Sequence, residues 1–586
     1  MGTEPAVDVR ADDTADGRLS AGMTGMTDIE VPVLIVGGGP VGLLGAQLLA
    51  HRGVRTLIAE KHIARLDAPK AHALNPRSLE ICHAAGLPMD AIHAAATRTD
   101  DGRFVRMVTT LAAPEIGSLP YERQDDAVRA LTPWPLINIA QPEFEAIVER
   151  AVRSQPNVEI RRGLEWQRCD QLTDVVVSTL VERSTGAHVK VRSRYVIAAD
   201  GAGSAVRDAI GIQMDGPAEL QRNVMIHFEA DLRGIVGDKP GILYFLFGPG
   251  PAGVFIAYDI GRTWVLMHPY RADAGTADQF DEARCRELVL AAVGAPVPNL
   301  VIKGARTWVM SAQVAKRYRT GNVFLAGDAG HRFPPTGGLG LNTGVGDIDN
   351  LTWKIAAVES GWAAPSILDT YQSERRAIAQ TNMGQSLANA MRLSILQQAL
   401  GYGANGTVDA ATFAARLSNT EARAKVDAAI AYQKEHFDSL RLQLGFAYGD
   451  ALKADDVLPI SEFTPKAVVG ARLPHVPLAD GRSTLDLVDV QGFTLICAPN
   501  HEAWRPLLDG CSVPLTIAAE GRDFEASSGS WSMRMGLESD GALLVRPDGH
   551  ILCRVVSAWT TDARQLAEAI DAYVGNAARP AAARST

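Results

Sequence analysis

Glycines and carboxylates at fixed spacing near the N-terminus could bind a phosphorylated ligand. The motif Gly37-x-Gly39-x-x-Gly42 follows a short β-branched run and contains Pro40, which suits the first turn of a helix. Glycines at these positions permit a tight turn and let backbone N–H groups approach a pyrophosphate at the helix N-terminus. Glu60 lies 18 residues beyond Gly42, at the end of the next apolar run, where a carboxylate can accept hydrogen bonds from ribose hydroxyls. This combination predicts a dinucleotide site rather than an empty glycine turn.

Two aspartates further along the chain also stand where predicted buried strands end. Asp200 opens the segment DGAGSAVR, and Asp328 opens the segment DAGHRFPPTGGLGLN. A carboxylate in the place of Asp328 can bind the hydroxyls of a sugar-like chain. The glycines let backbone approach a flat ring, and the helix that starts near Asn342 can stabilise negative charge on that ring. A solvated glycine loop, the alternative, would hardly need an aspartate, two adjacent prolines and a helix start together.

The segments around these motifs predict an α/β protein. Apolar residues at helical spacing fill 40–52, and short apolar runs typical of buried strands occur at 31–36, 54–59, 194–200 and 322–326. Strands joined through such a helix are parallel and belong to a sheet that is covered on both faces. Residues 216–320 are rich in strand-like aromatic runs, which predicts an antiparallel sheet inserted as a layer of its own.

The rest of the chain alternates helical and strand-like patterns. Helices are predicted over about 344–360 and through most of 366–445. Short strands and a closing helix near 561–574 predict a small α/β domain from about residue 465. The glycine spacing of the first motif recurs at Gly248-x-Gly250-x-x-Gly253, but a strand-like run follows it instead of a helix. We therefore expect a hairpin loop there.

Composition excludes several classes of protein. The 586 residues suggest about three or four domains, and a net charge of −10 disfavours nucleic acid as a partner. No apolar run approaches the ~18 residues of a membrane span. The six cysteines lie far apart without a C-x-x-C pair, so we expect no metal site and a reducing compartment, the cytoplasm. The first 28 residues are polar and small, which predicts a disordered tail without a signal peptide.

The three ordered motifs resemble those of the FAD-dependent aromatic hydroxylases, which are group A flavoprotein monooxygenases with the para-hydroxybenzoate hydroxylase fold. Among these, the segments AHALNPRSLEI (71–81) and YQSERRAIA (371–379) are similar to phenol hydroxylases of the 2,4-dichlorophenol 6-monooxygenase and 2-hydroxybiphenyl 3-monooxygenase type. Residues 469–496 resemble the thioredoxin-like tail domain of these enzymes without its paired cysteines, which leaves docking or oligomer contacts as its role. The resemblance covers nearly everything after residue 29.

The resemblance implies an α/β fold with three parts. These are a Rossmann-like FAD-binding domain, an inserted, mainly antiparallel β-sheet domain for the substrate, and a C-terminal thioredoxin-like domain without C-x-x-C. We expect a disordered tail at 1–28, a discontinuous FAD-binding domain at 29–100, 133–215 and 320–395, a substrate-binding domain at 101–132 and 216–319, a helical connection at 396–464, and the thioredoxin-like domain at 465–586.

The resemblance also implies which residues contact the cofactor and the substrate. Lys70 stands where an arginine is more usual, and lysine cannot make the same bidentate contact. The residues expected at FAD are Gly37, Gly39, Pro40, Gly42, Glu60, Lys61, Lys70, Arg77, Gln141, Asp200, Arg207, Asp328, Pro335, Gly338, Gly340, Leu341 and Asn342. Those expected at the substrate are Tyr244, Phe245, Tyr258, Trp308 and Pro335, although aromatic residues on strands are more often part of the core.

Two residues are expected to act in catalysis by removing a proton from the substrate. His72 falls in a segment that the resemblance places near the flavin, although a lone histidine is more often structural. Asp126 stands close to a position where relatives have an aspartate at the substrate pocket. Asp125, or simple exposure of Asp126 at the surface, are the alternatives.

By resemblance, the protein is a flavin-dependent monooxygenase that hydroxylates a phenol-like ring with NAD(P)H and O2 through a C4a-hydroperoxyflavin. FAD stays bound, whereas NADPH or NADH binds transiently because FAD takes the one dinucleotide motif. We expect a small phenolic substrate, no nucleic-acid or membrane partner, and a homo-oligomer. The alternatives are a monooxygenase acting on a polyketide or other natural product, a halogenase, and a non-catalytic FAD-binding scaffold. The halogenase motif W-x-W-x-I-P is absent.

Overall fold

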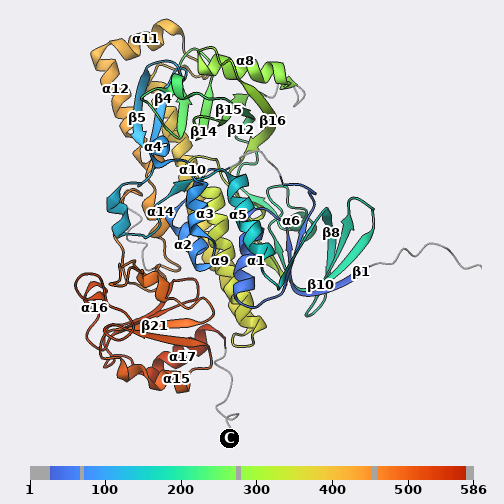
Figure 1. The fold of residues 1–586 in the computed structure, drawn as a ribbon, viewed down its shortest axis with the longest axis vertical. Coiled ribbons are helices and arrows are strands. Elements are labelled where there is room, and N and C mark those ends of the chain that lie inside the picture. The colour runs from blue at the N-terminus through green and yellow to red at the C-terminus, as the bar shows by residue number, and fades with distance from the viewer. Residues whose placement is uncertain (1–26, 66–70, 272–278, 451–457, 576–586) are drawn as a thin grey trace, which may run out of the picture.

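A computed structural model describes residues 27–65, 71–271, 279–450 and 458–575. Three blocks follow one another along the long axis of the molecule (Figure 1). They are a β-sheet block with helix α8 (Glu282–Val293), a central α/β block, and a C-terminal block coloured orange to red. Lys70 and residues 1–26 of the predicted tail lie outside the described ranges. The expected tail is too long, because residues 27 and 28 already belong to the first strand.

The central block is built on a sheet in which β18, β19, β10, β1, β2 and β7 lie side by side in that order. All neighbours are parallel except β18 and β19. The bounds are β1 (Thr27–Val36), β2 (Thr56–Glu60), β7 (Val158–Arg162), β10 (His188–Ala198), β18 (Arg319–Thr320) and β19 (Val323–Leu325). Two more strands, β8 (Leu164–Gln171) and β9 (Val176–Glu182), join the sheet as an antiparallel extension of β10. Because the parallel strands end at one edge, β2, β10 and β19 bring their last residues together.

Helices α1 (Pro40–His51), α5 (Gln141–Arg153) and α9 (Leu339–Glu359) pack beside this sheet, with α10 (Thr370–Ala399) alongside α9. Gly45 of α1 allows the close approach of α9, since a Cβ atom there would lie 2.5 Å from Ile348 Cγ1. Helix α9 begins three residues before the predicted start at Asn342. Its N-cap is Gly338, whose φ of 64° is in the left-handed region that favours glycine.

The second sheet carries seven strands in the order β16, β12, β15, β14, β13, β4 and β5, and it is antiparallel except between β13 and β4. The bounds are β4 (Phe104–Val108), β5 (Glu115–Pro120), β12 (Gln221–Glu229), β13 (Leu243–Leu246), β14 (Gly253–Asp259), β15 (Thr263–Tyr270) and β16 (Val301–Met310). One face packs with residues of α8 in a core that includes Phe228, Tyr244 and Trp264. The second glycine repeat, 248–253, is the hairpin connection between β13 and β14, as predicted.

The C-terminal block follows the short helices α11 (Ala410–Ser418) to α14 (Leu440–Leu444). Its sheet has the order β22, β21, β23 and β24, with β21 and β22 parallel and the other pairs antiparallel. The bounds are β21 (Phe493–Cys497), β22 (Leu515–Ala519), β23 (Ala542–Val545), β24 (Ile551–Val555) and the closing helix α17 (Ala563–Tyr573). The block packs on α9, where the rings of Trp353 and Phe493 meet edge to face. Among the helices of the described ranges, none is long and apolar enough to cross a bilayer.

Candidate active site

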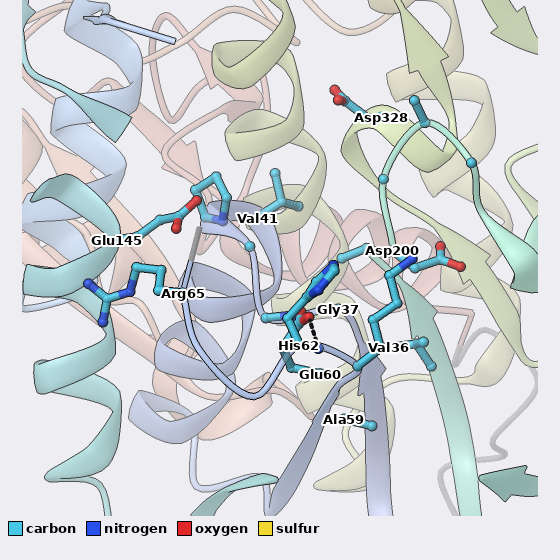
Figure 2. A pocket seen from close by; sticks show the side chains of 18 of the residues that line it. Val36, Gly37, Val41, Ala59, Glu60, His62, Arg65, Glu145, Asp200 and Asp328 are labelled. Carbon is cyan, nitrogen blue, oxygen red and sulfur yellow. Dashed lines mark hydrogen bonds between the residues drawn. The ribbon is translucent and has the colours of Figure 1, made fainter. Parts of the chain in front are cut away.

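A cavity of about 510 Å³ opens at the carboxyl edge of the central sheet. Three of the carboxylates that line it follow strands of the central sheet: Glu60 at the end of β2, Asp200 just after β10, and Asp328 just after β19 (Figure 2). Strand β1 lies between β2 and β10 and continues into the glycine loop 37–39. The crevice outside the carboxyl ends of the strands is the usual ligand site of open α/β sheets.

Backbone crowding explains the glycine motif. Gly37 has a φ of 109°, and a Cβ atom there would lie 2.3 Å from the Ala199 carbonyl oxygen. A Cβ atom on Gly42 would lie 2.0 Å from the Gly37 carbonyl oxygen, so Gly42 acts through packing. Gly39 differs, because a Cβ atom there would meet nothing within 4 Å. The loop is tied to β10 and α1 while its cavity side stays open to a phosphate at the α1 N-terminus.

Two of the carboxylates differ in how they are paired. Glu60 Oε2 accepts a hydrogen bond from the Gly38 N–H (2.7 Å), and Oε1 accepts one from the His62 N–H (2.8 Å). Asp200 Oδ2 accepts a hydrogen bond from the Val206 N–H (3.2 Å), but Oδ1 is buried and has no partner within the described ranges. Burial raises the pKa of Asp200. A buried oxygen without a partner costs free energy that a ligand hydroxyl would offset.

A second group of polar side chains consists of His72, Tyr121 and Tyr258. The ring centroids of His72 and Tyr121 are 5.8 Å apart, and those of His72 and Tyr258 are 6.3 Å apart. His72 Nδ1 lies 2.9 Å from Asn138 Oδ1, which assigns the proton to Nδ1 and leaves Nε2 as an acceptor. Burial lowers the pKa of His72, so the ring is neutral near pH 7.

This group borders the first turn of α9. A Cβ atom on Gly338 would lie 3.8 Å from the Tyr121 hydroxyl oxygen and 3.4 Å from Ala73 Cβ. Asn342 Nδ2 donates to the Ala73 carbonyl (3.0 Å). Two residues of the same turn, Gly340 and Leu341, line the cavity. The turn therefore lies between a cavity that fits a nucleotide and this group of aromatic and histidine side chains.

Comparisons with known proteins agree with this geometry. Residues 30–386 match the family model described as FAD binding domain, and residues 466–577 match that of aromatic-ring hydroxylase, C-terminal. The chain belongs to the FAD-binding aromatic-ring hydroxylases. This membership confirms the predicted family, FAD as the cofactor and aromatic hydroxylation as the class of reaction.

Relatives and solved structures match almost the whole chain. The chain is 31% identical to tetracenomycin B2 monooxygenase-dioxygenase of Streptomyces olivaceus, over 92% of this chain and 96% of that protein. It is 30% identical to 2,4-dichlorophenol 6-monooxygenase of Cupriavidus pinatubonensis, over 93% of this chain and 97% of that protein. The structure of the flavin-dependent monooxygenase PieE, solved with FAD and substrate, is similar with a TM-score of 0.88 and 31% identity over 94% of this chain and 100% of PieE.

The residues of the cavity fit FAD. Open space at Gly39 suits a pyrophosphate, the unpartnered Oδ1 of Asp200 suits a hydroxyl donor, and the first turn of α9 presents backbone N–H groups to a ring edge. Ten of the residues predicted at FAD line this cavity: Gly37, Gly39, Pro40, Glu60, Lys61, Gln141, Asp200, Asp328, Gly340 and Leu341.

Two predicted arginines do not line the FAD cavity. Arg77 instead donates to Asp349 Oδ2 (3.3 Å) and to the Asp548 carbonyl (2.6 Å), which is a contact with the C-terminal block. The buried Arg207 donates to the Ala329 carbonyl (3.3 Å) and so joins the two aspartate loops. Both arginines therefore support the structure around the site, and their contact with FAD stays a prediction.

Three more residues predicted at FAD, Pro335, Gly338 and Asn342, lie at or near the start of α9 and do not line the cavity. Asn342 Oδ1 accepts hydrogen bonds from the Asn75 N–H (3.0 Å) and the Ser78 hydroxyl (2.7 Å), and Nδ2 also donates to the Gly338 carbonyl (2.7 Å). These bonds occupy the Asn342 amide and fasten α9 to the start of α2 (Pro76–Ala84). Pro335 is exposed.

One wall of the cavity was not predicted. It comes from the segment after β2, from α5 and from the residues around the β7–β8 connection: Arg65, Glu145, Arg162, Leu164, Glu165 and Trp166. Strand β7 lies next to β2, so its last residue, Arg162, reaches the same edge of the sheet. Arg65 donates to Glu149 Oε2 (2.7 Å), but its Nε is buried without a partner among the described residues. The position of β7 in the sheet is the signal that would have indicated this wall.

The predicted substrate aromatics divide between the two faces of the second sheet. Tyr258 and Trp308 pack with Met225 on the face opposite α8. Phe245 packs with the cluster that contains Tyr121. Tyr244 belongs to the other face, where its hydroxyl donates to the Lys239 carbonyl (3.0 Å). The expected substrate role of Tyr244 is therefore corrected to the core role that was its alternative.

Asp126 does not join the His72 group. Its side chain is 107% exposed and lies 3.9 Å from Arg129. Asp125 caps the short helical turn that follows it, accepting a hydrogen bond from the Val128 N–H (3.2 Å). The structure thus shows the surface position that was left as an alternative, and of the two predicted catalytic residues only His72 borders the site.

Proposed function

We propose that this enzyme hydroxylates a phenolic ring with O2 and NAD(P)H, and that the substrate lies between the first turn of α9 and the face of the second sheet that carries Tyr258. The observation that supports this most directly is the position of His72, Tyr121 and Tyr258 beside Gly338, in contact with the turn that borders the FAD cavity. FAD, when bound, supplies the oxygen chemistry that amino-acid side chains lack.

His72 is proposed to take the phenol proton. A phenol has a pKa of about 10, so only about one molecule in a thousand is ionised at pH 7, and electrophilic oxygen transfer needs the electron-rich anion. The neutral ring of His72 keeps Nε2 free, because Nδ1 donates to Asn138. Burial raises the pKa of Tyr258, so its hydroxyl stays protonated and can donate to the phenolate.

The test compares His72→Ala with His83→Ala. His83 is a half-exposed histidine whose Nε2 bonds to Asp486 (2.9 Å), away from this group. His72→Ala should slow hydroxylation about 100-fold while FAD stays bound, and the NAD(P)H consumed should reappear as H2O2. His83→Ala should behave like the wild type. If His72→Ala keeps the wild-type ratio of product to H2O2 from pH 6 to 9, His72 is not the base.

A polycyclic aromatic substrate of the polyketide type is the second candidate. The face that carries Phe245, Tyr258, Met267 and Trp308 extends over five neighbouring strands, which is roughly 19 Å at about 4.8 Å per strand step. Phe245, Met267 and Trp308 are only partly buried there. This width exceeds one phenol ring. Product masses from a panel of simple phenols, biaryl phenols and polycyclic hydroxyaromatics would decide, with an increase of 16 mass units expected for the true substrate class.

NADPH or NADH is proposed to bind only transiently. In the described ranges, one glycine fingerprint stands in a βαβ unit, and the other forms the hairpin between β13 and β14. The described ranges therefore offer no second motif for a dinucleotide that stays bound. Comparing kcat/KM for the two reductants would identify the one used. A dinucleotide that copurifies with the protein beside FAD would contradict transient binding.

A further inference from the structure

Asp347 of α9 holds the loop that carries Asp328. Its Oδ2 accepts hydrogen bonds from the Gly327 N–H (3.2 Å) and from His331 Nε2 (2.9 Å), and its side chain is fully buried. Burial acts to raise the pKa of this carboxyl, but Arg375 and His331 outweigh it and hold the pKa below its usual range. A charged Asp347 therefore fixes the backbone next to Asp328, which lines the FAD cavity.

Arg375 of α10 in turn orients Asp347. Its Nε donates to Asp347 Oδ1 (2.9 Å), one terminal nitrogen donates to the Thr343 carbonyl (3.1 Å), and the other donates to the Tyr448 hydroxyl (3.4 Å). Arg375 is 2% exposed. The position of Asp347 thus depends on where α10 and Tyr448 hold this guanidinium.

Arg546 of the C-terminal block contacts both α10 and Tyr448. The two terminal nitrogens of Arg546 donate to the carboxylate of Glu374 (2.7 and 3.0 Å), the residue before Arg375 on α10. The same guanidinium lies 4.9 Å from the centre of the Tyr448 ring. One arginine of the C-terminal block therefore holds both α10 and Tyr448, each of which positions Arg375.

The groups around Arg546 form a network of paired charges. Arg546 also donates to Asp548 (3.0 and 2.5 Å), and Asp548 accepts a hydrogen bond from Trp353 Nε1 of α9 (3.1 Å). Glu374 accepts a further hydrogen bond from Lys354 Nζ (2.7 Å). Burial acts to raise the pKa of Glu374, but Arg546 and Lys354 lower it well below its usual range. Removal of Arg546 leaves the carboxylates of Glu374 and Asp548 with too little positive charge around them, so the segments that carry them must shift.

We propose that Arg546 is a positioning residue for FAD, acting through Glu374, Arg375 and Asp347 on the loop of Asp328. On this view, docking of the C-terminal block on α9 and α10 sets the shape of the cofactor site, in addition to any contacts with other chains. The inference rests on FAD being the ligand of the cavity. Each step from Arg546 to the loop is a hydrogen bond, a ring contact or, between Glu374 and Arg375, the peptide bond that joins them.

The test uses the full chain and three substitutions. Arg546→Met removes the charge at similar volume, and Arg546→Lys keeps the charge without the bidentate contact. Arg554→Met is the matched control, because Arg554 lies on β24 of the same block and donates to the Met535 and Gly536 carbonyls of that block. For each protein, the FAD dissociation constant, the visible circular dichroism of the bound flavin and the thermal unfolding midpoint are measured.

Arg546→Met is expected to weaken FAD binding about tenfold and to change the dichroism of the flavin, with a smaller effect for Arg546→Lys. Arg554→Met should keep the wild-type FAD affinity and dichroism even if its unfolding midpoint falls. If Arg546→Met fails to fold, Tyr448→Phe, which removes the hydroxyl facing Arg375, should still weaken FAD binding at least twofold. If both Arg546 variants keep wild-type FAD affinity and flavin dichroism, the inference is overturned, but the proposed function is not. The same holds if Arg546→Met fails to fold and Tyr448→Phe keeps the wild-type values. A wild-type protein that does not bind FAD would overturn the proposed function as well.

Discussion

Tyr258→Phe should make the protein more stable and the enzyme less efficient. The Tyr258 hydroxyl is buried and has no partner in the described part of the chain. Such a group costs about 1–3 kcal/mol in the folded state, because it has lost its hydrogen bonds to water. Its removal should therefore raise the free energy of unfolding by a similar amount. The Tyr258 ring lies edge to face with the His72 ring, where we place the substrate.

Tyr244→Phe is the matched control on the same sheet. Its hydroxyl donates to the Lys239 carbonyl on the face that packs under α8. Loss of this bond should lower the free energy of unfolding by about 0.5–1.5 kcal/mol and leave turnover unchanged. Each variant lacks one oxygen atom of the wild-type protein, yet the two should change the free energy of unfolding in opposite directions.

Thermal unfolding and steady-state kinetics together measure both effects. At about 2–4 °C per kcal/mol, the midpoints of the two variants should lie on opposite sides of the wild-type value. Loss of a hydrogen bond to the substrate should lower kcat/KM about two- to tenfold in Tyr258→Phe. If Tyr258→Phe is destabilised like Tyr244→Phe, its hydroxyl is paired in the protein and the reasoning fails. If it is stabilised with unchanged kcat/KM, the hydroxyl does not meet the substrate.

Three further changes test other parts of the structure. Gly37→Ala should weaken FAD binding about tenfold or more in a fluorescence titration, because its Cβ would lie 2.3 Å from the Ala199 carbonyl oxygen; Gly53→Ala, with a φ of 75° but open space around it, should cost only about 1 kcal/mol of stability. Burial raises the pKa of Glu122 to about 7, so the stability provided by its protonated form is lost as the pH rises through that value. Relative to Glu122→Gln, the free energy of unfolding should fall by about 3 kcal/mol from pH 4 to 8, and parallel pH profiles in denaturant titrations would contradict this. Asp126→Ala should keep hydroxylation and its coupling at wild-type levels, since the carboxylate is fully exposed.

The cofactor site could be predicted where its signal is local in the sequence. The glycine loop, Glu60, Asp200 and Asp328 each belong to a strand end, and the pattern of the strand fixes which edge of the sheet the residue reaches. The steric need at Gly37 is not local, because a Cβ atom there would meet the Ala199 carbonyl oxygen, which follows β10 far along the chain. The motif predicts the glycine, but only the packing of β10 beside β1 shows what the glycine avoids.

The functions of the arginines could not be predicted in this way. Arg77 contacts a carbonyl 471 residues away, at Asp548, and its motif gives no indication of that partner. The same holds for Tyr121, which follows β5 of the second sheet and meets His72 only through tertiary packing. Long side chains and residues between domains take their roles from distant partners, so sequence spacing alone did not indicate the contact of Arg77 with the C-terminal block.

Buried polar groups in this enzyme fall into two kinds that serve different purposes. Asp200 Oδ1 and the Tyr258 hydroxyl lack partners among the described residues, and they lie where we place FAD and the substrate. Asp347 is fully buried and Glu374 is 12% exposed, and both are engaged with arginine, histidine or lysine. Unpaired groups cost stability until a ligand binds, so they need a rigid surrounding to stay in place. The paired network that extends from Arg546 supplies that rigidity, which explains why an aromatic hydroxylase keeps a C-terminal block without redox cysteines packed behind its cofactor helix.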